Sequence, residues 1–228
     1  MTLDIKVNDF AIRSFRDQAD ADYISARMAC RTQLMSPYLW ACQQAIEKYL
    51  KCILLPNRIS APKVFHDLDK ALAIAESDLR LDLTPRSQEF IRYINEYGGY
   101  RYLEISSFAS GRSIIELDRT VWELRRFCTL DRGPREMTLR SGVVPPKVRL
   151  KGGYLEEIID DKNHPARPPL VRGNGFFGPR SRKRVSVGSW TKLVNAPLSL
   201  HPEILDEVRK YIFLPKHVID GYRVVTHT

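Results

Sequence analysis

The densest cationic stretch of the chain supplies four positive side chains within a few residues: Arg180, Arg182, Lys183 and Arg184. One proline separates this stretch from GNGFFG at 173–178, which adds two aromatic rings, Phe176 and Phe177. Cations bind nucleic-acid phosphates, and aromatic rings stack on unpaired bases. The alternative is a hairpin whose phenylalanines anchor it to the protein while its cations face water. We favour anchoring for the two rings and polyanion binding for the cations.

A second candidate contact is Arg101, which stands between Tyr100 and Tyr102. A guanidinium can bind a phosphate through two hydrogen bonds while a neighbouring ring stacks on a base. The other interpretation is an ion pair with a carboxylate such as Glu47 or Glu96, with the tyrosines half-buried. The residues leave both interpretations open, and Arg101 and Tyr102 are predicted as binding residues.

His66 is the histidine that stands where a helix is predicted to begin, before Asp67-Leu68. Its imidazole could contact a phosphate or exchange protons near neutral pH. It could instead cap that helix and hydrogen-bond into the core, which we favour.

No metal site or cofactor is predicted. Asp160 and Asp161 are adjacent and would point apart, and His164 has no further ligand beside it. The four cysteines show no CxxC spacing and are expected to be buried, reduced thiols.

The elements that must position these residues start with a helix over 36–55. Its apolar residues fall on one broad arc. The opposite, polar arc carries Gln43, Gln44, Glu47, Lys48 and Lys51, and we expect the two lysines to be solvated. Ser36 followed by a proline predicts the start of this helix. Similar periodicity predicts further helices over 9–35, from 66, from Thr84 to Gly98, and from the capping-box spacing of Ser113 and Glu116.

The composition changes after residue 130, where most prolines and glycines of the chain are found. We therefore predict two parts: a helical bundle over 1–130, and a small β-rich appendage over 131–228 that is closed by a helix from Ser199. The predicted strands are 147–151 paired with 154–159 across a glycine turn, and 169–171 paired with 184–187. The fold class is mainly α: an up-and-down bundle of four to five helices with this appendage packed on it.

The net charge of +9 is distributed unevenly between the two parts. Residues 1–130 hold 18 Lys and Arg against 17 Asp and Glu, a net charge of +1, so 131–228 carry the remaining +8. A basic segment beside a neutral domain favours a polyanionic partner, nucleic acid above all.

Three groups of residues resemble the HEPN family, the "higher eukaryotes and prokaryotes nucleotide-binding" domains. The first is QQA-x-EK-x-x-K from Gln43 to Lys51, followed by Leu54-Leu55. The second is His66-Asp67-Leu68 with Leu72. The third is Tyr97-x-x-x-Arg101-Tyr102, where Leu103 replaces the proline that is frequent in the family. The resemblance covers about 9–130. It implies a bundle of four or five helices, usually a homodimer, in proteins that handle RNA or nucleotides, some beside a nucleotidyltransferase partner.

HEPN ribonucleases carry an arginine, four to six intervening residues and a histidine, which would hold the scissile phosphate and move a proton at the ribose. None of the five histidines has an arginine at that spacing. This absence argues against a standard HEPN nuclease and predicts no catalytic residue. The alternative is a divergent, metal-independent endoribonuclease of a toxin–antitoxin or defence system, with His66 and Arg101 as its candidates.

The predicted function is therefore a HEPN-type protein that binds RNA or a nucleotide without cutting it, as a homodimer or with a partner protein. A protein-binding adaptor is a third possibility. No apolar run in the chain is long enough to span a membrane, and the N-terminus is charged, unlike a signal peptide. We therefore expect a cytoplasmic location and no membrane contact.

Overall fold

The computed structural model describes most of the chain between residues 3 and 220. The described residues are 3–60, 64, 66–98, 107–128, 153–178, 190–194, 204–211, 216, 219 and 220. The predicted boundary near residue 131 lies outside these ranges, and the division into two parts therefore stays a prediction.

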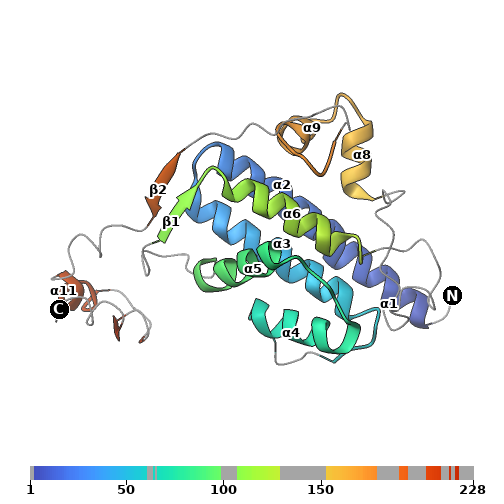
Figure 1. Ribbon diagram of the computed structural model, residues 1–228, viewed down its shortest axis with the longest axis horizontal. Coiled ribbons are helices and arrows are strands. Elements are labelled where there is room, and N and C mark those ends of the chain that lie inside the picture. Colours follow the sequence, from blue (N-terminus) through green and yellow to red (C-terminus); the bar gives the residue numbers. More distant parts are fainter. Residues whose placement is uncertain are drawn as a thin grey trace.

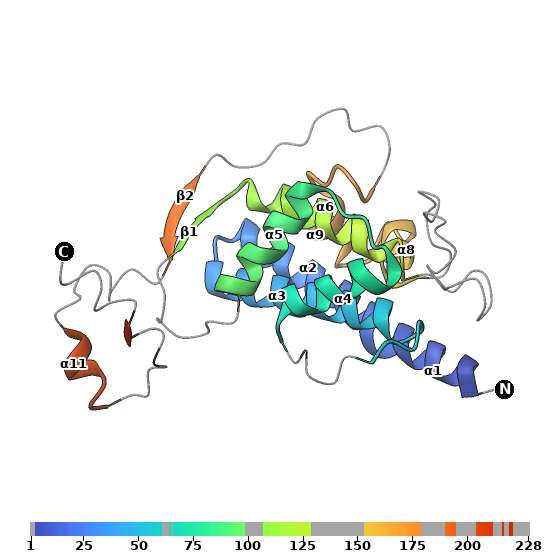
Figure 2. The ribbon, with the colours of Figure 1, turned by 60° about the horizontal axis from the view of Figure 1, so that its bottom comes forward.

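Helices dominate the described residues, as predicted, and most of them pack side by side (Figure 1). In chain order the bundle elements are α1 (Leu3–Ala11), the π-helical turn η1 (Ile12–Arg16), α2 (Asp17–Arg31), α3 (Met35–Leu54), α4 (Leu68–Leu79), α5 (Pro85–Tyr97) and α6 (Ser113–Arg125). The most extensive packing joins α2 to α3, because only three residues connect these two long helices. Figure 2 shows α4 and α5 beside α3, with α6 completing the bundle.

Helix α3 is the central element, and its predicted span is confirmed to within one residue at each end. Its apolar arc is buried, with Cys42, Ile46 and Leu50 fully enclosed. The predicted cap is wrong: Leu34 is the N-cap residue and Ser36 lies within the first turn. On the polar arc, Gln43 and Glu47 are buried. The two lysines expected to be solvated are 26% and 38% exposed and pair with Asp22 and Glu47.

The first predicted helix is present but starts earlier than expected. Its helical backbone runs from Leu3 through η1 to the end of α2. Gln33, with φ of 58°, reverses the chain into α3. A left-handed residue just past a helix is a common helix terminator, usually a glycine or asparagine, so this glutamine gave no warning in the sequence.

The starts of the other bundle helices follow the predicted positions but use different groups. Asp67, rather than His66, is the N-cap of α4, and its carboxylate accepts from the backbone N–H of Lys70 at 3.0 Å. Thr84 is the N-cap residue of α5, with Pro85 in the first turn. The predicted capping box of α6 is wrong, since the Ser113 hydroxyl donates back to the Ser110 carbonyl at 2.6 Å.

The β-rich appendage is not supported. Residues 154–159, predicted as a strand, belong to helix α8 (Tyr154–Asp160), and the predicted strand 169–171 belongs to α9 (Arg167–Val171). The physical reason is the spacing of the apolar residues: Leu155 and Ile158 stand three apart and are both fully buried, which is a helical and not an alternating pattern. The proposed strand partners, 147–151 and 184–187, lie outside the described residues.

The described part of the C-terminal region otherwise contains one strand and one short helix. Strand β2 (Thr191–Val194) pairs antiparallel with β1 (Ser107–Ser110), so that Ser107 faces Val194 and Ser110 faces Thr191 (Figures 1 and 2). The helix expected from Ser199 is represented by α11 (Leu205–Val208). Among the described residues, no helix has the length and apolar content that a membrane crossing requires.

Candidate nucleic-acid interface

The predicted binding residues lie outside the described parts of the chain. This applies to Arg101 and Tyr102, which follow the end of α5, and to the four cations Arg180, Arg182, Lys183 and Arg184. We name residues 179–189 the basic loop from their sequence alone, since they lie outside the described ranges. What the structure describes are the residues on either side of it and the bundle surface that holds them.

The N-terminal side of the basic loop is held in place by Asn174. The Asn174 side-chain amide donates to the Tyr23 hydroxyl at 2.8 Å, and its carbonyl oxygen accepts from the backbone N–H groups of Phe176 and Phe177 at 3.0 and 2.9 Å. Asn174 is itself buried. A buried amide that satisfies this many groups fixes the local backbone.

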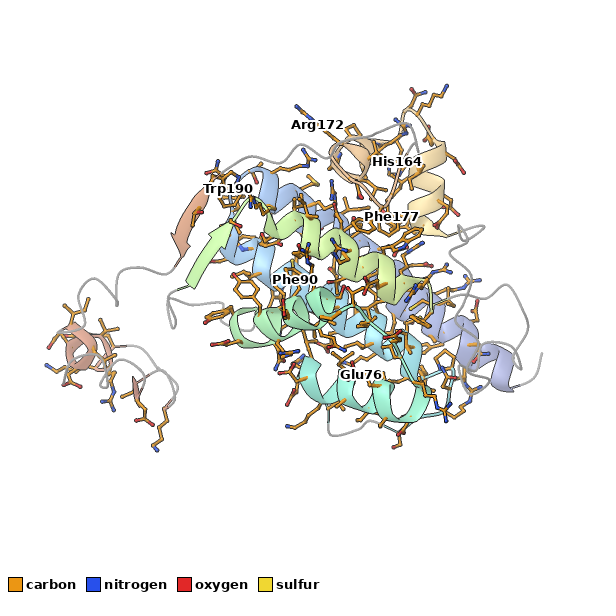
Figure 3. The ribbon with its side chains drawn as sticks, viewed as in Figure 1. Glu76, Phe90, His164, Arg172, Phe177 and Trp190 are labelled. Atoms are coloured by element: carbon orange, nitrogen blue, oxygen red, sulfur yellow. The ribbon has the colours of Figure 1, made fainter. Side chains whose placement is uncertain are left out.

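The two phenylalanines act as anchors and are not free to stack on bases. Phe177 is 4% exposed and contacts the rings of Tyr23 and Trp122, with centroids 5.5 and 5.4 Å apart (Figure 3). Phe176 is half-buried, and the Arg119 guanidinium lies over its ring at 5.6 Å. The anchoring role that the sequence favoured for these rings is confirmed, and any base stacking must use other residues.

The C-terminal side of the basic loop is held by the small sheet. The backbone N–H of Gly111 donates to the Trp190 carbonyl at 3.0 Å, and β2 follows at once, paired with β1. Figure 3 shows Trp190 close to the start of α6. Both ends of the basic loop therefore leave from positions that hydrogen bonds fix to the bundle.

A buried arginine on α2, Arg27, holds the segment before the loop. Its guanidinium is fully buried, pairs with the Asp118 carboxylate, and donates to the backbone carbonyls of Pro169 and Arg172 at 2.9 and 2.8 Å. The same Asp118 oxygen accepts from the Tyr23 hydroxyl at 2.6 Å, while its second oxygen has no hydrogen-bond partner among the described residues. Burial raises the pKa of Asp118, although the pairing with Arg27 works in the opposite direction.

A second buried arginine, Arg125 on α6, holds α8. It forms two hydrogen bonds to each of two carboxylates: Asp20 at 2.7 and 2.8 Å, and Glu156 at 2.7 and 2.8 Å. The Tyr49 hydroxyl also donates to Asp20, at 2.5 Å. Burial alone would lower the pKa of Arg125, but the two carboxylates raise it well above its ordinary value. Four of the five donors of this guanidinium are therefore used inside the protein.

His66 lies on a different face, next to the polar arc of α3. Its Nδ1 is 2.9 Å from an oxygen of the buried Glu47 carboxylate, whose other oxygen accepts from Lys51 at 2.5 Å. The imidazole is otherwise open to solvent, with 74% of the side chain exposed. His66 thus hydrogen-bonds into the bundle, as favoured, but does not cap α4.

Helix α5 approaches α3 closely at its C-terminal end. Gly98 ends α5, and a Cβ added there would lie 2.6 Å from the Ile94 carbonyl oxygen and 2.9 Å from the Gln43 Cβ. Only glycine allows this approach of α5 to α3. Arg101 follows Gly98 by three residues in the chain, so the tight packing fixes where the segment bearing Arg101 begins.

The sequence did not lead us to predict that Arg27 and Arg125 are buried. On α2, Asp20 and Arg27 are both fully buried. One signal was available: Asp20, Tyr23 and Arg27 recur at three- and four-residue steps, on the same face as the apolar Ala19 and Ala26. Charged residues at core positions indicate buried partners elsewhere in the chain.

No group of three or more potential metal ligands occurs within the described ranges. His164, which the sequence analysis considered beside Asp160 and Asp161, instead accepts from the backbone N–H of Ala166 through Nδ1 at 3.1 Å. The cysteines Cys30, Cys42, Cys52 and Cys128 are all buried and unbridged, and burial raises the pKa of Cys30 to about 11.

Comparison with known families gives one result. Residues 12–123 match the sequence model of the HEPN domain, and the helical bundle belongs to the HEPN domain family. HEPN domains are often nucleotide-related and dimeric, so the match is consistent with a function related to nucleotides or RNA. No curated protein and no solved structure matches the chain significantly.

Proposed function

We propose that this protein binds RNA or a nucleotide through the basic loop without cleaving it. The observation that carries the proposal is that both ends of the loop are fixed: Asn174 and Phe177 are buried against α2 and α6 on one side, and Trp190 is bonded to Gly111 on the other. Because the residues on both sides are fixed, the length of chain between them keeps the four cations within reach of the bundle. The membership of the bundle in the HEPN family makes a nucleotide or RNA the favoured polyanion.

Binding by the basic loop should depend steeply on salt. For single-stranded RNA, each phosphate contact contributes about 0.7 to the slope of log affinity against log salt concentration. We expect Arg182→Glu with Arg184→Glu to reduce both affinity for a mixed-sequence RNA and this slope, measured by fluorescence anisotropy on the full chain.

The matched control is Arg86→Glu with Arg92→Glu, which changes the net charge equally at exposed positions of α5. Equal losses for the two variants would mean that net charge alone sets the affinity. Binding of the unaltered protein that is insensitive to salt would contradict the proposal outright.

Arg101 and Tyr102 are proposed as a second contact, on the bundle side. Arg101→Gln should weaken RNA binding without changing the urea unfolding midpoint if the guanidinium meets a phosphate. If the guanidinium forms an internal ion pair instead, the midpoint should fall and the affinity should not.

We also propose that the protein acts as a homodimer or beside a partner such as a nucleotidyltransferase, because HEPN domains are often dimeric. Light scattering on the purified chain gives the mass of the assembly. Copurification from the native host, analysed by mass for protein and by absorbance for RNA, separates a dimer, a two-protein complex and a protein-only adaptor.

One observation favours a second candidate, a divergent metal-independent endoribonuclease. The Glu47 carboxylate at 2.9 Å from His66 Nδ1 would orient the imidazole and leave Nε2 to transfer a proton. The proposal predicts toxicity on overexpression that His66→Ala or Arg101→Ala relieves. Harmless overexpression together with intact RNA after incubation would remove this candidate.

A further inference from the structure

Two exposed arginines, Arg31 and Arg172, meet beside the point where the chain approaches the basic loop. Arg31 stands at the end of α2, and its guanidinium donates to the backbone carbonyl of Arg172, just past the end of α9. The same carbonyl accepts from the buried Arg27 at 2.8 Å. The backbone of Arg172 is therefore fixed by two guanidinium groups at once.

The Arg172 side chain takes no part in this fixation. It lies at the outer edge of the molecule beside α9 (Figure 3), and no hydrogen bond or carboxylate partner is found for it among the described residues. The following Gly173 has φ of 60°, a conformation that favours glycine and turns the chain sharply back toward the buried Asn174. This turn presents the Arg172 side chain outward on a rigid backbone.

The charges around these arginines do not balance. Arg27, Arg31 and Arg172 together carry three positive charges, and Asp118 is the one carboxylate among the described groups that pairs with them. Burial and then repulsion by Arg27 and Arg172 lower the pKa of Arg31, which is the expected effect of like charges in close proximity. An anion bound here would relieve this repulsion.

Protein stability does not account for both exposed guanidinium groups. The carbonyl that Arg31 contacts is already hydrogen-bonded to Arg27, and a guanidinium offers five donors, of which Arg31 uses one among the described contacts. Guanidinium groups bind phosphate bidentately, so the free donors of Arg31 and Arg172 suit a phosphodiester backbone. The basic loop begins only a few residues further along the chain.

We propose that Arg31 and Arg172 bind RNA phosphates and extend the interface from the basic loop onto the surface formed by the end of α2 and the end of α9. This inference rests on the proposed function, since it assigns further contacts for the same ligand. It names RNA because the bundle is a HEPN domain and because two neighbouring arginines can engage successive phosphates.

The test measures binding of a fluorescein-labelled single-stranded RNA of mixed sequence to the full chain over a range of salt concentrations. Arg31→Gln with Arg172→Gln should lower affinity on the order of tenfold near physiological salt and reduce the salt slope by about 1.4, two contacts at 0.7 each. Arg86→Gln with Arg92→Gln is the control, and Arg182→Gln with Arg184→Gln reports on the loop. Because Arg31 contacts a backbone carbonyl, Arg172→Gln alone is the variant that leaves every described contact intact, and it should reduce the slope by about 0.7, half of the reduction expected for the double variant.

The outcomes separate the two proposals. Losses in both the loop variant and the Arg31/Arg172 variant support both proposals. A loss in the loop variant alone, with Arg172→Gln equal to the control, overturns this inference and leaves the proposed function standing. No RNA binding by the unaltered protein overturns both, and binding to acidic vesicles or acidic peptides in its place shows that the partner class is wrong.

Discussion

Two of the buried arginines, Arg27 and Arg125, hold the same C-terminal segment to the bundle but are neutralised differently. Arg125 meets two carboxylates through four hydrogen bonds of 2.7–2.8 Å. Arg27 meets one carboxylate, Asp118, and two backbone carbonyls, and one Asp118 oxygen is left without a partner. The first cluster is thus closed and slightly negative, whereas the second continues through Arg31 to the surface with excess positive charge.

This difference indicates a structural role for the Arg125 cluster and leaves unneutralised positive charge near the surface at the Arg27 cluster. The Arg125 guanidinium is buried and uses four of its five donors on two carboxylates, so this cluster serves to attach α8. The Arg27 cluster fixes backbone through carbonyls, which leaves neighbouring guanidinium groups unneutralised. The Arg27 cluster reaches the surface with positive charge that no carboxylate neutralises among the described residues. This surface charge, and not the number of arginines, is the feature that would attract a polyanion.

The largest predicted effect is at Arg125. Arg125→Met leaves Asp20 and Glu156 buried without their partner, which should cost about 3–5 kcal/mol of unfolding free energy in urea titrations. Arg126→Met, at the half-buried neighbouring position, is the control and should cost less than about 1 kcal/mol. Arg27→Met should cost less than Arg125→Met, because it strands one carboxylate and not two. Equal costs would contradict the comparison.

The next effect concerns the attachment of the segment before the basic loop. Asn174→Ala removes the acceptor of two backbone N–H groups and the donor to the Tyr23 hydroxyl, at an expected cost of about 2–3 kcal/mol. Hydrogen exchange should increase mainly in 170–178 while α3 stays protected. Asn163→Ala, at an exposed position of the same segment, should change neither quantity, and a uniform increase across the bundle would argue against a local anchor.

The smallest effect is a pH dependence at Cys30, which lies beside the Arg27 cluster. Burial raises the pKa of Cys30 from about 9 to about 11, against the lowering effect of Arg27 and Arg31. Because the folded state keeps the thiol proton that the unfolded state releases, stability should fall as pH rises from about 9 to 11, by about 2 kcal/mol from this group. Cys30→Ala should flatten this part of the stability curve, and an unchanged slope would contradict the assignment.

Local patterns predicted the bundle well. Helix spans follow from apolar spacing: α6 begins at Ser113, where a helix is predicted, and buries Ile114, Leu117, Val121 and Leu124 at three- and four-residue steps. The wrong predictions concern helix caps and one strand, where a local sequence signal had more than one structural meaning. Ser36 and Ser113 looked like caps but are not, since the backbone conformation at helix ends also depends on the preceding chain. The strand prediction for 154–159 failed because a glycine pair was taken for a hairpin turn although the apolar spacing is helical.

The candidate site was predicted less completely than the fold. The sequence singled out the basic loop and His66, and it favoured the anchoring role of Phe177. It did not identify Arg31 and Arg172 as neighbours, since 141 positions separate them in the chain. Composition can locate an excess of charge along a sequence but not which cations lie together in space.

The sequence by itself determined the helical architecture, the HEPN family and the concentration of positive charge after residue 130, because periodicity, motif and composition are properties of local stretches. Only the tertiary structure decided which charged residues are buried. Arg27 and Asp118 are 91 positions apart and Arg125 and Asp20 are 105 apart, so their pairing depends on how α2 and α6 pack. A charged side chain can be buried without a large loss of stability only where folding brings its partner within hydrogen-bond distance. No local sequence pattern encodes that distance.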